Sequence, residues 1–292
     1  MPLLYLGAGF QPAGHILDVA RTAEECGFDG LALPDHVGYP VTLESQYPGT
    51  ESGEVPWSVD ETPWTDPWVA LSAVAAVTDR LRLMTHIYVL PLRDPVLVAK
   101  TVGSAAAMFP GRMELGIGVG WNAEEFALVG ADFGNRGART DESIDVLRAL
   151  WGPQPASYAG SHYSFSDVAM FPAPSSPVPI LVGGSSPAAM ERAVRTGDGF
   201  VAMPTTVAEL EWLVGQLRAG LARHGRSPDD FHINTVPKDV DSPDALGRLD
   251  DLGVTSVQVH PFTRDQAIHG SLGEKLDAIR VWADRMIGTR AT

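Results

Sequence analysis

Three glycines alternate along one short segment of the chain, at Gly116, Gly118 and Gly120, and Trp121 and Asn122 follow them. The segment begins as an apolar strand, and an acidic helix start comes after it. Glycines at the carboxyl end of a strand allow a flat ligand to lie against bare backbone. This end of a strand is also where α/β enzymes hold their catalytic groups. We therefore expect a ligand site here, with Gly118, Gly120 and Trp121 among its contacts.

Polar side chains also end the second and the third strand that the sequence predicts. Asp35 and His36 close the second strand, where a histidine can donate to a ring nitrogen or carbonyl, or move a proton at neutral pH. The alternative interpretation is a helix-capping Asp35 and a surface His36. Thr85 and His86 stand inside the otherwise apolar third strand. They indicate a site, unless backbone groups satisfy the imidazole of His86.

The run Gly183-Gly184-Ser185-Ser186 lies between a predicted strand and a helix that begins at Pro187. Free amides at the helix start, glycines that give access and two hydroxyls form an anion site, most naturally for phosphate. The alternative is a tight turn in which Ser186 is an ordinary N-cap. Because the run follows a barrel strand, we favour the phosphate site.

Two arginines, Arg136 and Arg139, follow the first half of a split helix. Either guanidinium could bind a phosphate through two parallel hydrogen bonds. Ion pairs with Asp132, Asp141 or Glu142 are an equally good interpretation. Of the two, Arg136 is the one that we include in the candidate site.

Strands and helices alternate strictly along the chain. The predicted strands are 3–8, 30–33, 81–87, 113–119, 180–182, 199–202, 231–236 and 256–260. The predicted helices are 16–26, 67–77, 95–108, a split helix over 123–129 and 140–150, 187–196, 207–224, 243–251 and 265–287. Such alternation means parallel strands with crossover helices. Eight repeats favour a closed TIM (β/α)₈ barrel over an open doubly wound sheet.

Two long segments interrupt this pattern. Residues 37–64 form a proline- and glycine-rich loop after the second strand, which we interpret as a lid or a wall of the substrate pocket. Residues 153–179 carry alternating aromatic residues and a proline cluster, which predict an inserted β-hairpin between the fourth helix and the fifth strand. The length of 292 residues fits one barrel domain, 1–292, that includes both insertions.

Composition excludes several function classes. The net charge of −15, without a basic stripe, argues against nucleic-acid binding. The lone Cys26 allows no internal disulfide and fits a reducing compartment. No apolar run approaches the ~18 residues of a membrane span, and the N-terminus has no signal-peptide pattern. We expect a cytoplasmic protein away from membranes, without a metal site, because the histidines have no metal-ligand spacing.

An ordered set of segments resembles the luciferase-like monooxygenase superfamily, in particular its coenzyme F420-associated actinobacterial branch. The matching segments are GFDGLALPDHV, DPWVALSAVAAVTDRLRLMTHIYVLPLRDPVLVAK, PGRMELGIGVGWNAEEFALVG, RTDESIDVLRALW and PVPILVGGSSPAAMERAVRTGDGFVAM. They run from about Gly27 to Met203, and the C-terminal third matches only in pattern.

The resemblance implies a TIM barrel with an insertion that binds F420, or alternatively FMN, at the carboxyl ends of the strands. It places Asp35 and His36 beside the deazaflavin ring as the catalytic pair, and a bulged cis peptide at His86-Ile87 behind the ring. The loop after the fifth strand would bind the phosphate. The coenzyme-binding residues are then expected to be Thr85, His86, Ile87, Gly118, Gly120, Trp121, Arg136, Gly183, Gly184, Ser185 and Met203.

Two residues depart from the pattern of the family. His86 stands where a small residue is usual, so either the following bond is not cis or a polar group lies near the ring. Trp121 stands where the sugar-phosphate dehydrogenases of the family carry a catalytic glutamate, which suggests a more apolar substrate.

The expected function is F420-dependent hydride transfer to or from a small organic substrate, with His36 orienting the ring and acting in proton transfer. The first alternative is an FMN-dependent monooxygenase, which would need a flavin reductase as partner. The second is a flavin-binding protein without turnover. The family resemblance also implies a homodimer.

Overall fold

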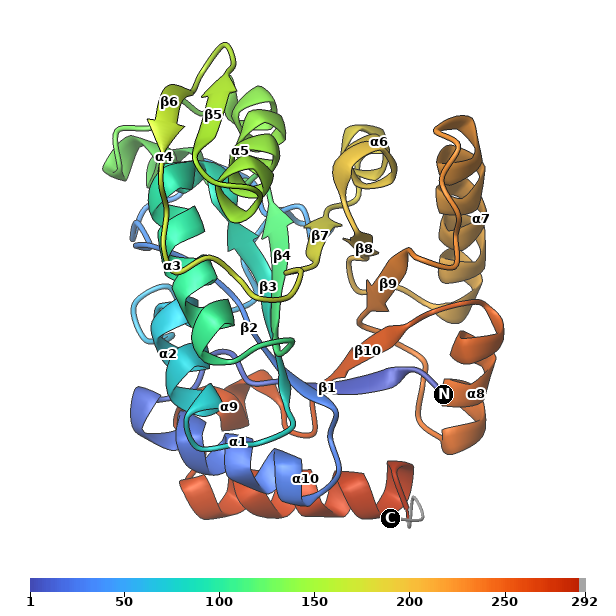
Figure 1. Cartoon of the computed structure of the whole chain (residues 1–292). Helices are drawn as coiled ribbons and strands as arrows, with labels where there is room; N and C mark the ends of the chain where they lie inside the picture. The colour runs from blue at the N-terminus through green and yellow to red at the C-terminus, as the bar shows by residue number, and fades with distance from the viewer. Residues whose placement is uncertain (289–292) are drawn as a thin grey trace.

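Eight parallel strands close into a barrel in the computed structural model, which describes residues 1–288 (Figure 1). Around the barrel the strands follow the order β1-β10-β9-β8-β7-β4-β3-β2. They are β1 (Leu3–Gly7), β2 (Gly30–Leu33), β3 (Arg82–Val89), β4 (Met113–Gly118), β7 (Ile180–Gly183), β8 (Gly199–Val201), β9 (His232–Thr235) and β10 (Ser256–Val259). The predicted TIM barrel is confirmed.

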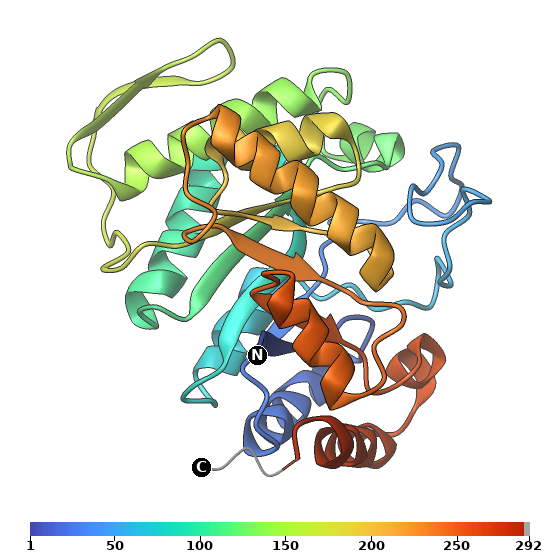
Figure 2. The same cartoon turned by 90° about the vertical axis from the view of Figure 1, so that its right-hand side faces the viewer.

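Helices surround the barrel on its outer side (Figure 1, Figure 2). They are α1 (Ile16–Glu25), α2 (Pro67–Ala75), α3 (Pro95–Met108), α4 (Ala123–Leu128), α5 (Arg136–Trp151), α6 (Pro187–Thr196), α7 (Val207–Arg223), α8 (Pro243–Asp251), α9 (Arg264–His269) and α10 (Leu272–Met286). Four of them begin at a proline that follows an aspartate or serine cap, a pattern that the sequence displays directly.

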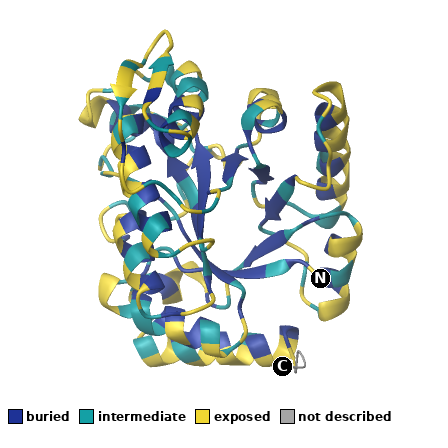
Figure 3. Ribbon diagram, in the orientation of Figure 1, coloured by how far each residue is buried: buried dark blue, intermediate teal, exposed yellow. Residues whose placement is uncertain are grey.

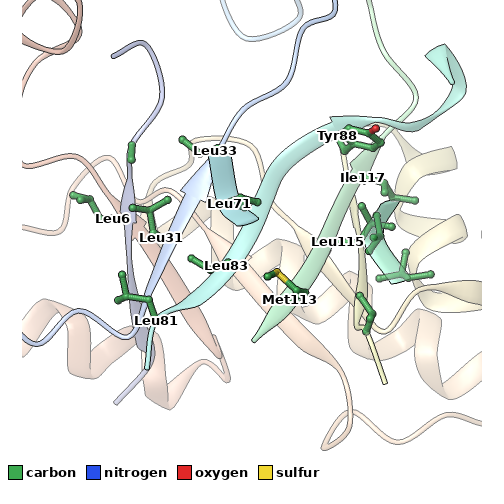
Figure 4. Packing of buried hydrophobic residues seen from close by; sticks show 14 of the residues in the cluster. Leu6, Leu31, Leu33, Leu71, Leu81, Leu83, Tyr88, Met113, Leu115 and Ile117 are labelled. Carbon is green, nitrogen blue, oxygen red and sulfur yellow. The ribbon is translucent and has the colours of Figure 1, made fainter. Parts of the chain in front are cut away.

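The main core lies between the strands and the helices, where buried residues concentrate (Figure 3). Leu31, Leu83 and Met113 are paired in register on neighbouring strands, and Leu71 of α2 lies beside them (Figure 4). Burying one such leucine contributes roughly 1.5–3 kcal/mol. A second cluster of Tyr5, Ala32, Met84, Leu181 and Val201 fills the barrel interior.

Two predicted helices differ from the structure. The helix expected over 265–287 is divided into α9 and α10 by Gly270, and Ser271 caps α10 in a capping box with Glu274. The apolar period continues across this break, so periodicity alone joins the two helices. The second half of the split helix begins at Arg136 and not at Thr140.

The two interruptions of the barrel pattern differ in structure. The predicted hairpin is present as β5 (Ala156–Ala159) and β6 (Ser164–Val168), which pair antiparallel. Residues 37–64 contain neither helix nor strand and lie as an extended loop beside the barrel (Figure 2). Within residues 1–288, no helix is both long and apolar enough to cross a membrane.

Candidate active site

A bulge in β3 shapes the carboxyl end of the barrel. The register between β3 and β4 shifts between Thr85 and Tyr88, and the peptide bond between His86 and Ile87 is cis. The bulged cis peptide that the family resemblance implies is therefore present, with an imidazole at the position where a small side chain is usual.

The glycines of β4 and β7 make room for this bulge. A Cβ on Gly116 would lie 2.2 Å from the carbonyl oxygen of Thr85, and one on Gly118 would lie 1.9 Å from Cδ1 of Ile87. A Cβ on Gly183 would approach Cγ2 of Ile87 to 2.9 Å. Residues of β3 therefore fill the space where the side chains of these positions would lie. We had assigned that space to a flat ligand.

Thr85 lies at the start of the bulge in β3. Its side chain is fully buried, and its hydroxyl donates to the carbonyl oxygen of Gly116 over 2.8 Å. The hydroxyl of Thr85 is thus engaged inside the barrel, and the expected contact of Thr85 with the coenzyme stays a prediction. Its hydrogen bond stabilises the bulge beside His86 and Ile87.

Asp35 lies at the end of β2 and pairs with Arg93. The guanidinium donates to both carboxylate oxygens, over 2.6 and 2.8 Å, and the amide of Val89 donates to Oδ2 over 2.9 Å. Burial raises the pKa of Asp35, and the hydrogen bonds from Arg93 oppose the rise. With both oxygens engaged, this carboxylate holds β2 and β3 together and orients the next residue, His36.

His36 is held by Glu125 of α4. Nδ1 of His36 lies 2.8 Å from Oε2 of Glu125, and the amide of Val37 donates to Oε1 over 2.6 Å. Both side chains are buried, with 8% and 2% of their surface exposed. Because Glu125 fixes a hydrogen on Nδ1, Nε2 is the free nitrogen of the ring, and it has no protein partner within residues 1–288.

Aromatic rings enclose His36. The ring of Trp64 is 4.5 Å and that of Tyr39 4.8 Å from the imidazole, between centroids, and both meet it edge-on. Trp121 lies at 6.1 Å on the β4–α4 loop. We call these rings, together with others in contact with them, the aromatic cluster; its members are Phe10, Tyr39, Tyr47, Trp57, Trp64 and Trp121.

Three hydrogen-bonding groups of the aromatic cluster lack a partner. They are the hydroxyl of Tyr39 and the indole nitrogens of Trp57 and Trp64, all buried in the described part of the chain. Buried polar groups are nearly always hydrogen-bonded in native proteins. These nitrogens are suited to an oxygen atom of a bound molecule close to His36.

Two charged residues fasten the loop 37–64 to the barrel. Glu124 of α4 accepts hydrogen bonds from the amides of Glu44 and Ser45. Desolvation raises its pKa, but these bonds and the Ser45 hydroxyl outweigh that effect and hold it at about 2. Arg264 donates to the carbonyl of Pro56 and lies over the ring of Trp57 at 5.7 Å.

The loop between β7 and α6 has the predicted form. Gly184 has φ of +141°, and the Ser186 hydroxyl caps α6 by accepting from the amide of Ala189 over 3.2 Å. Ser185 is exposed and makes no hydrogen bond within residues 1–288. Ser186 is therefore an N-cap, as the alternative interpretation expected. The side chain of Ser185 and the backbone amides at the start of α6 also remain available to a ligand.

Arg136 braces the loop after β4. Nε donates to the carbonyl of Gly120 over 3.1 Å and Nη1 to that of Phe133 over 2.9 Å, and the guanidinium stacks on the Phe133 ring. The ion-pair alternative is wrong for Arg136, because Asp141 pairs instead with Arg192 and Arg195. Met203 follows β8 at the same end of the barrel and is partly buried.

Comparison with known proteins agrees with this architecture. Residues 4–235 match the family model described as luciferase-like monooxygenase. The chain belongs to the luciferase-like monooxygenase family. An uncharacterized protein of Mycobacterium tuberculosis (strain H37Rv) is 36% identical over 243 residues, which are 83% of each chain.

Luciferase-like proteins similar to this chain include coenzyme F420 enzymes. The F420-dependent glucose-6-phosphate dehydrogenase of Nakamurella multipartita is 31% identical over 224 residues, 74% of this chain and 60% of that protein. The solved structure of an F420-dependent secondary alcohol dehydrogenase, in complex with an F420-acetone adduct, matches the fold with a TM-score of 0.76 at 17% identity. That match covers 99% of this chain and 100% of the other.

In this luciferase-like barrel, several polar residues of the site lack a local sequence signal. Glu125 looks like an ordinary acidic residue in the first turn of a helix, as does Glu124. Asn234 of β9 accepts a hydrogen bond from Nε2 of His86 over 3.1 Å, and His260 follows β10. Only the barrel closure brings these residues to the same opening as His36 and His86.

Proposed function

We propose that this chain is an F420-dependent oxidoreductase that acts on a small, apolar organic alcohol or carbonyl compound. The observation that carries the proposal is the buried pair of His36 and Glu125, which leaves one imidazole nitrogen free inside the aromatic cluster. F420-dependent relatives at 31–32% identity support the choice of coenzyme.

The residues at the barrel mouth fit a tricyclic coenzyme with a phosphate tail. The buried indole nitrogens of Trp57 and Trp64 lack acceptors, and the β7–α6 loop offers Ser185 and the start of α6. Ile87 would lie behind the ring, and Gly184 and Ser185 would hold the phosphate. When bound, the deazaflavin supplies a two-electron hydride donor or acceptor.

His36 would move the proton that accompanies this transfer. Nε2 can take the hydroxyl proton of an alcohol during oxidation, or give a proton to a carbonyl oxygen during reduction. Glu125 would hold the ring in one orientation, because its carboxylate accepts from Nδ1 of His36 and leaves Nε2 directed away from it. Asp35 makes no direct hydrogen bond to this pair, because Arg93 occupies both of its oxygens.

The aromatic cluster supports an apolar substrate. Tyr39, Trp64 and Trp121 surround His36, and the segment 116–122 contains no carboxylate. We further propose that the loop 37–64 is a lid, since it contains neither helix nor strand and supplies most rings of the cluster. Its closure would exclude water from His36 during the reaction.

Spectroscopic titration of the purified protein tests this function. We expect saturable binding of F420, little binding of FMN, and a change of the F420 absorbance with apolar secondary alcohols or ketones but not with glucose 6-phosphate. The variant His36→Ala should bind F420 and lose turnover by about 100-fold or more. Binding of FMN with oxygen consumption would favour the monooxygenase instead, and binding without any turnover would favour a coenzyme-binding protein.

A further inference from the structure

Two histidines lie at the barrel mouth, one from β3 and one directly after β10, close enough for His260 to act electrostatically on His86. His86 bonds to Asn234 on the inner face of β9, so its ring points into the barrel. A Cβ on Gly7 of β1 would lie 2.3 Å from Nε2 of His260, which shows that the glycine leaves room for this second ring. As residues, His86 is half-buried and His260 is exposed, so the pair lies at the rim of the barrel and not in its packed core.

Hydrogen bonds fix which nitrogen of each ring is free. Nε2 of His86 donates to Oδ1 of Asn234, whose Nδ2 in turn donates to the Ser256 hydroxyl over 2.8 Å. In this tautomer Nδ1 of His86 carries no hydrogen; no other residue within 1–288 bonds to it, although the ring lies close to the backbone of His86 itself. Gln258 Nε2 donates to Nε2 of His260 over 3.1 Å, so the hydrogen of this neutral ring lies on Nδ1. The pair offers one acceptor and one donor.

The surroundings of the two rings favour an uncharged ligand. Burial lowers the pKa of each histidine to about 4, and each is neutral at pH 7. No carboxylate contributes to either shift; His260 acts on His86, and Arg264 on His260. The carbonyl oxygen Oε1 of Gln258 is buried without a partner, which marks a further unused hydrogen-bonding group beside His260.

We propose that His86 and His260 form a subsite that binds the imide edge of a ring, the pyrimidinedione edge that flavins and deazaflavins share. His86 accepts from the ring N–H, and His260 donates to a neighbouring carbonyl. The inference rests on the proposed function, because it assigns part of the coenzyme to named residues. It explains why a histidine occupies position 86, because a small residue there could not form a hydrogen bond with the imide edge.

Binding of ring analogues measures this contact without turnover. The probes are F420 or FMN, whichever binds, and the derivative methylated at N3, which cannot donate. We expect the wild-type protein to bind the methylated probe at least about tenfold more weakly than its parent, and His86→Ala to lose most of this difference. His260→Ala should weaken both probes. His224→Ala, at a surface histidine paired with Glu191, is the matched control and should behave as the wild type.

Nitrogen-15 NMR of the wild-type protein gives a second readout that needs no variant to fold. The Nδ1 resonance of His86 should shift on binding of the parent probe and stay in place with the methylated one. An unshifted resonance together with equal affinities for the two probes would overturn the subsite and leave the proposed function standing. Failure of the wild type to bind either coenzyme would overturn the proposed function itself.

Discussion

Neighbouring glutamates at the start of α4 have separate roles that depend on the direction of their side chains. Glu125 is buried and holds His36, whereas Glu124 faces the loop 37–64 and holds its amides. The backbone amide of Glu125 donates to the side chain of Asn122, which caps α4. This cap fixes the start of the helix and so the directions of the Glu124 and Glu125 side chains. One helix start thus serves the proton-transfer residue and the loop that covers it.

Replacing Glu125 by glutamine should impair turnover more than binding. The amide of glutamine is a weaker acceptor than a carboxylate and can present its NH2 group to Nδ1, so the His36 ring would be held less firmly. We expect kcat to fall about 10- to 100-fold while the affinity for F420 stays near that of the wild type. Steady-state kinetics and a coenzyme titration separate the two effects.

The matched control is Glu124→Gln, one position away on the same helix turn. It leaves His36 untouched, so it should change KM through the loop and not kcat. An equal loss of coenzyme affinity and kcat in Glu125→Gln would contradict a positioning role and indicate general disruption of the mouth.

The sequence identifies Asp35 and His36 as polar residues at a strand end, but not the different environments that they have. Arg93, the partner of Asp35, is 58 residues away in the chain, and Glu125 is 89 residues from His36. Such pairings depend on how helices and strands come together, which no local pattern encodes. The roles of Asp35 and His36 in catalysis stay predictions.

At the scale of elements, β3 and β4 fit together because glycine replaces larger residues opposite the bulge. Gly116 faces the backbone oxygen of Thr85, while Gly118 faces the side chain of Ile87, whose terminal methyl group is its nearest atom. A backbone oxygen cannot move away without breaking the strand pairing, but a terminal methyl group can rotate. The two glycines therefore tolerate substitution differently.

Gly116→Ala should destabilise the protein by about 1–3 kcal/mol or more, the usual cost of overpacking, and Gly118→Ala by clearly less. Chemical denaturation of both variants measures the difference. Gly215→Ala in α7 is the control, since its Cβ would meet nothing within 4 Å. There alanine should stabilise the helix by up to about 1 kcal/mol. Equal losses at Gly116 and Gly118 would show that the bulge adapts to either side chain.

Element boundaries were predictable where a local cap defines them. The bounds of α3, α6 and α8 agree with the sequence prediction, and each follows an aspartate or serine and a proline. The break between α9 and α10 escapes prediction because Gly270 sits inside a continuing apolar period. Ser271, which caps α10, can be recognised as a helix cap only when the break before it is known.

For the molecule as a whole, alternation of eight strands and helices was enough to predict the closed barrel. The barrel interior was not predictable, because its contacts depend on the register of strands that are distant in sequence. His86 of β3 bonds to Asn234 of β9, 148 residues away, and Asn234 bonds to Ser256 of β10. These two hydrogen bonds connect opposite sides of the barrel through three polar side chains that no local sequence pattern relates.

His86 should make the stability of the barrel depend on pH. Its pKa is lowered to about 4 in the folded protein by burial and by His260, against roughly 6.5 in the unfolded chain. Below about pH 6.5 the unfolded chain binds a proton that the folded protein does not, so the free energy of unfolding falls as the pH is lowered towards 4. The slope from this residue is at most about 1.4 kcal/mol per pH unit.

Denaturant unfolding between pH 4.5 and 7.5 measures this slope. The variant His86→Ala should lose stability less steeply below pH 6.5 than the wild type, so that the difference between the two narrows as the pH falls. Parallel curves for His86→Ala and the wild type would mean that His86 takes up its proton equally readily in the folded barrel. That result would contradict the claim that His86 is neutral at the barrel mouth, and with it the claim that His86 accepts a hydrogen bond from a bound ring.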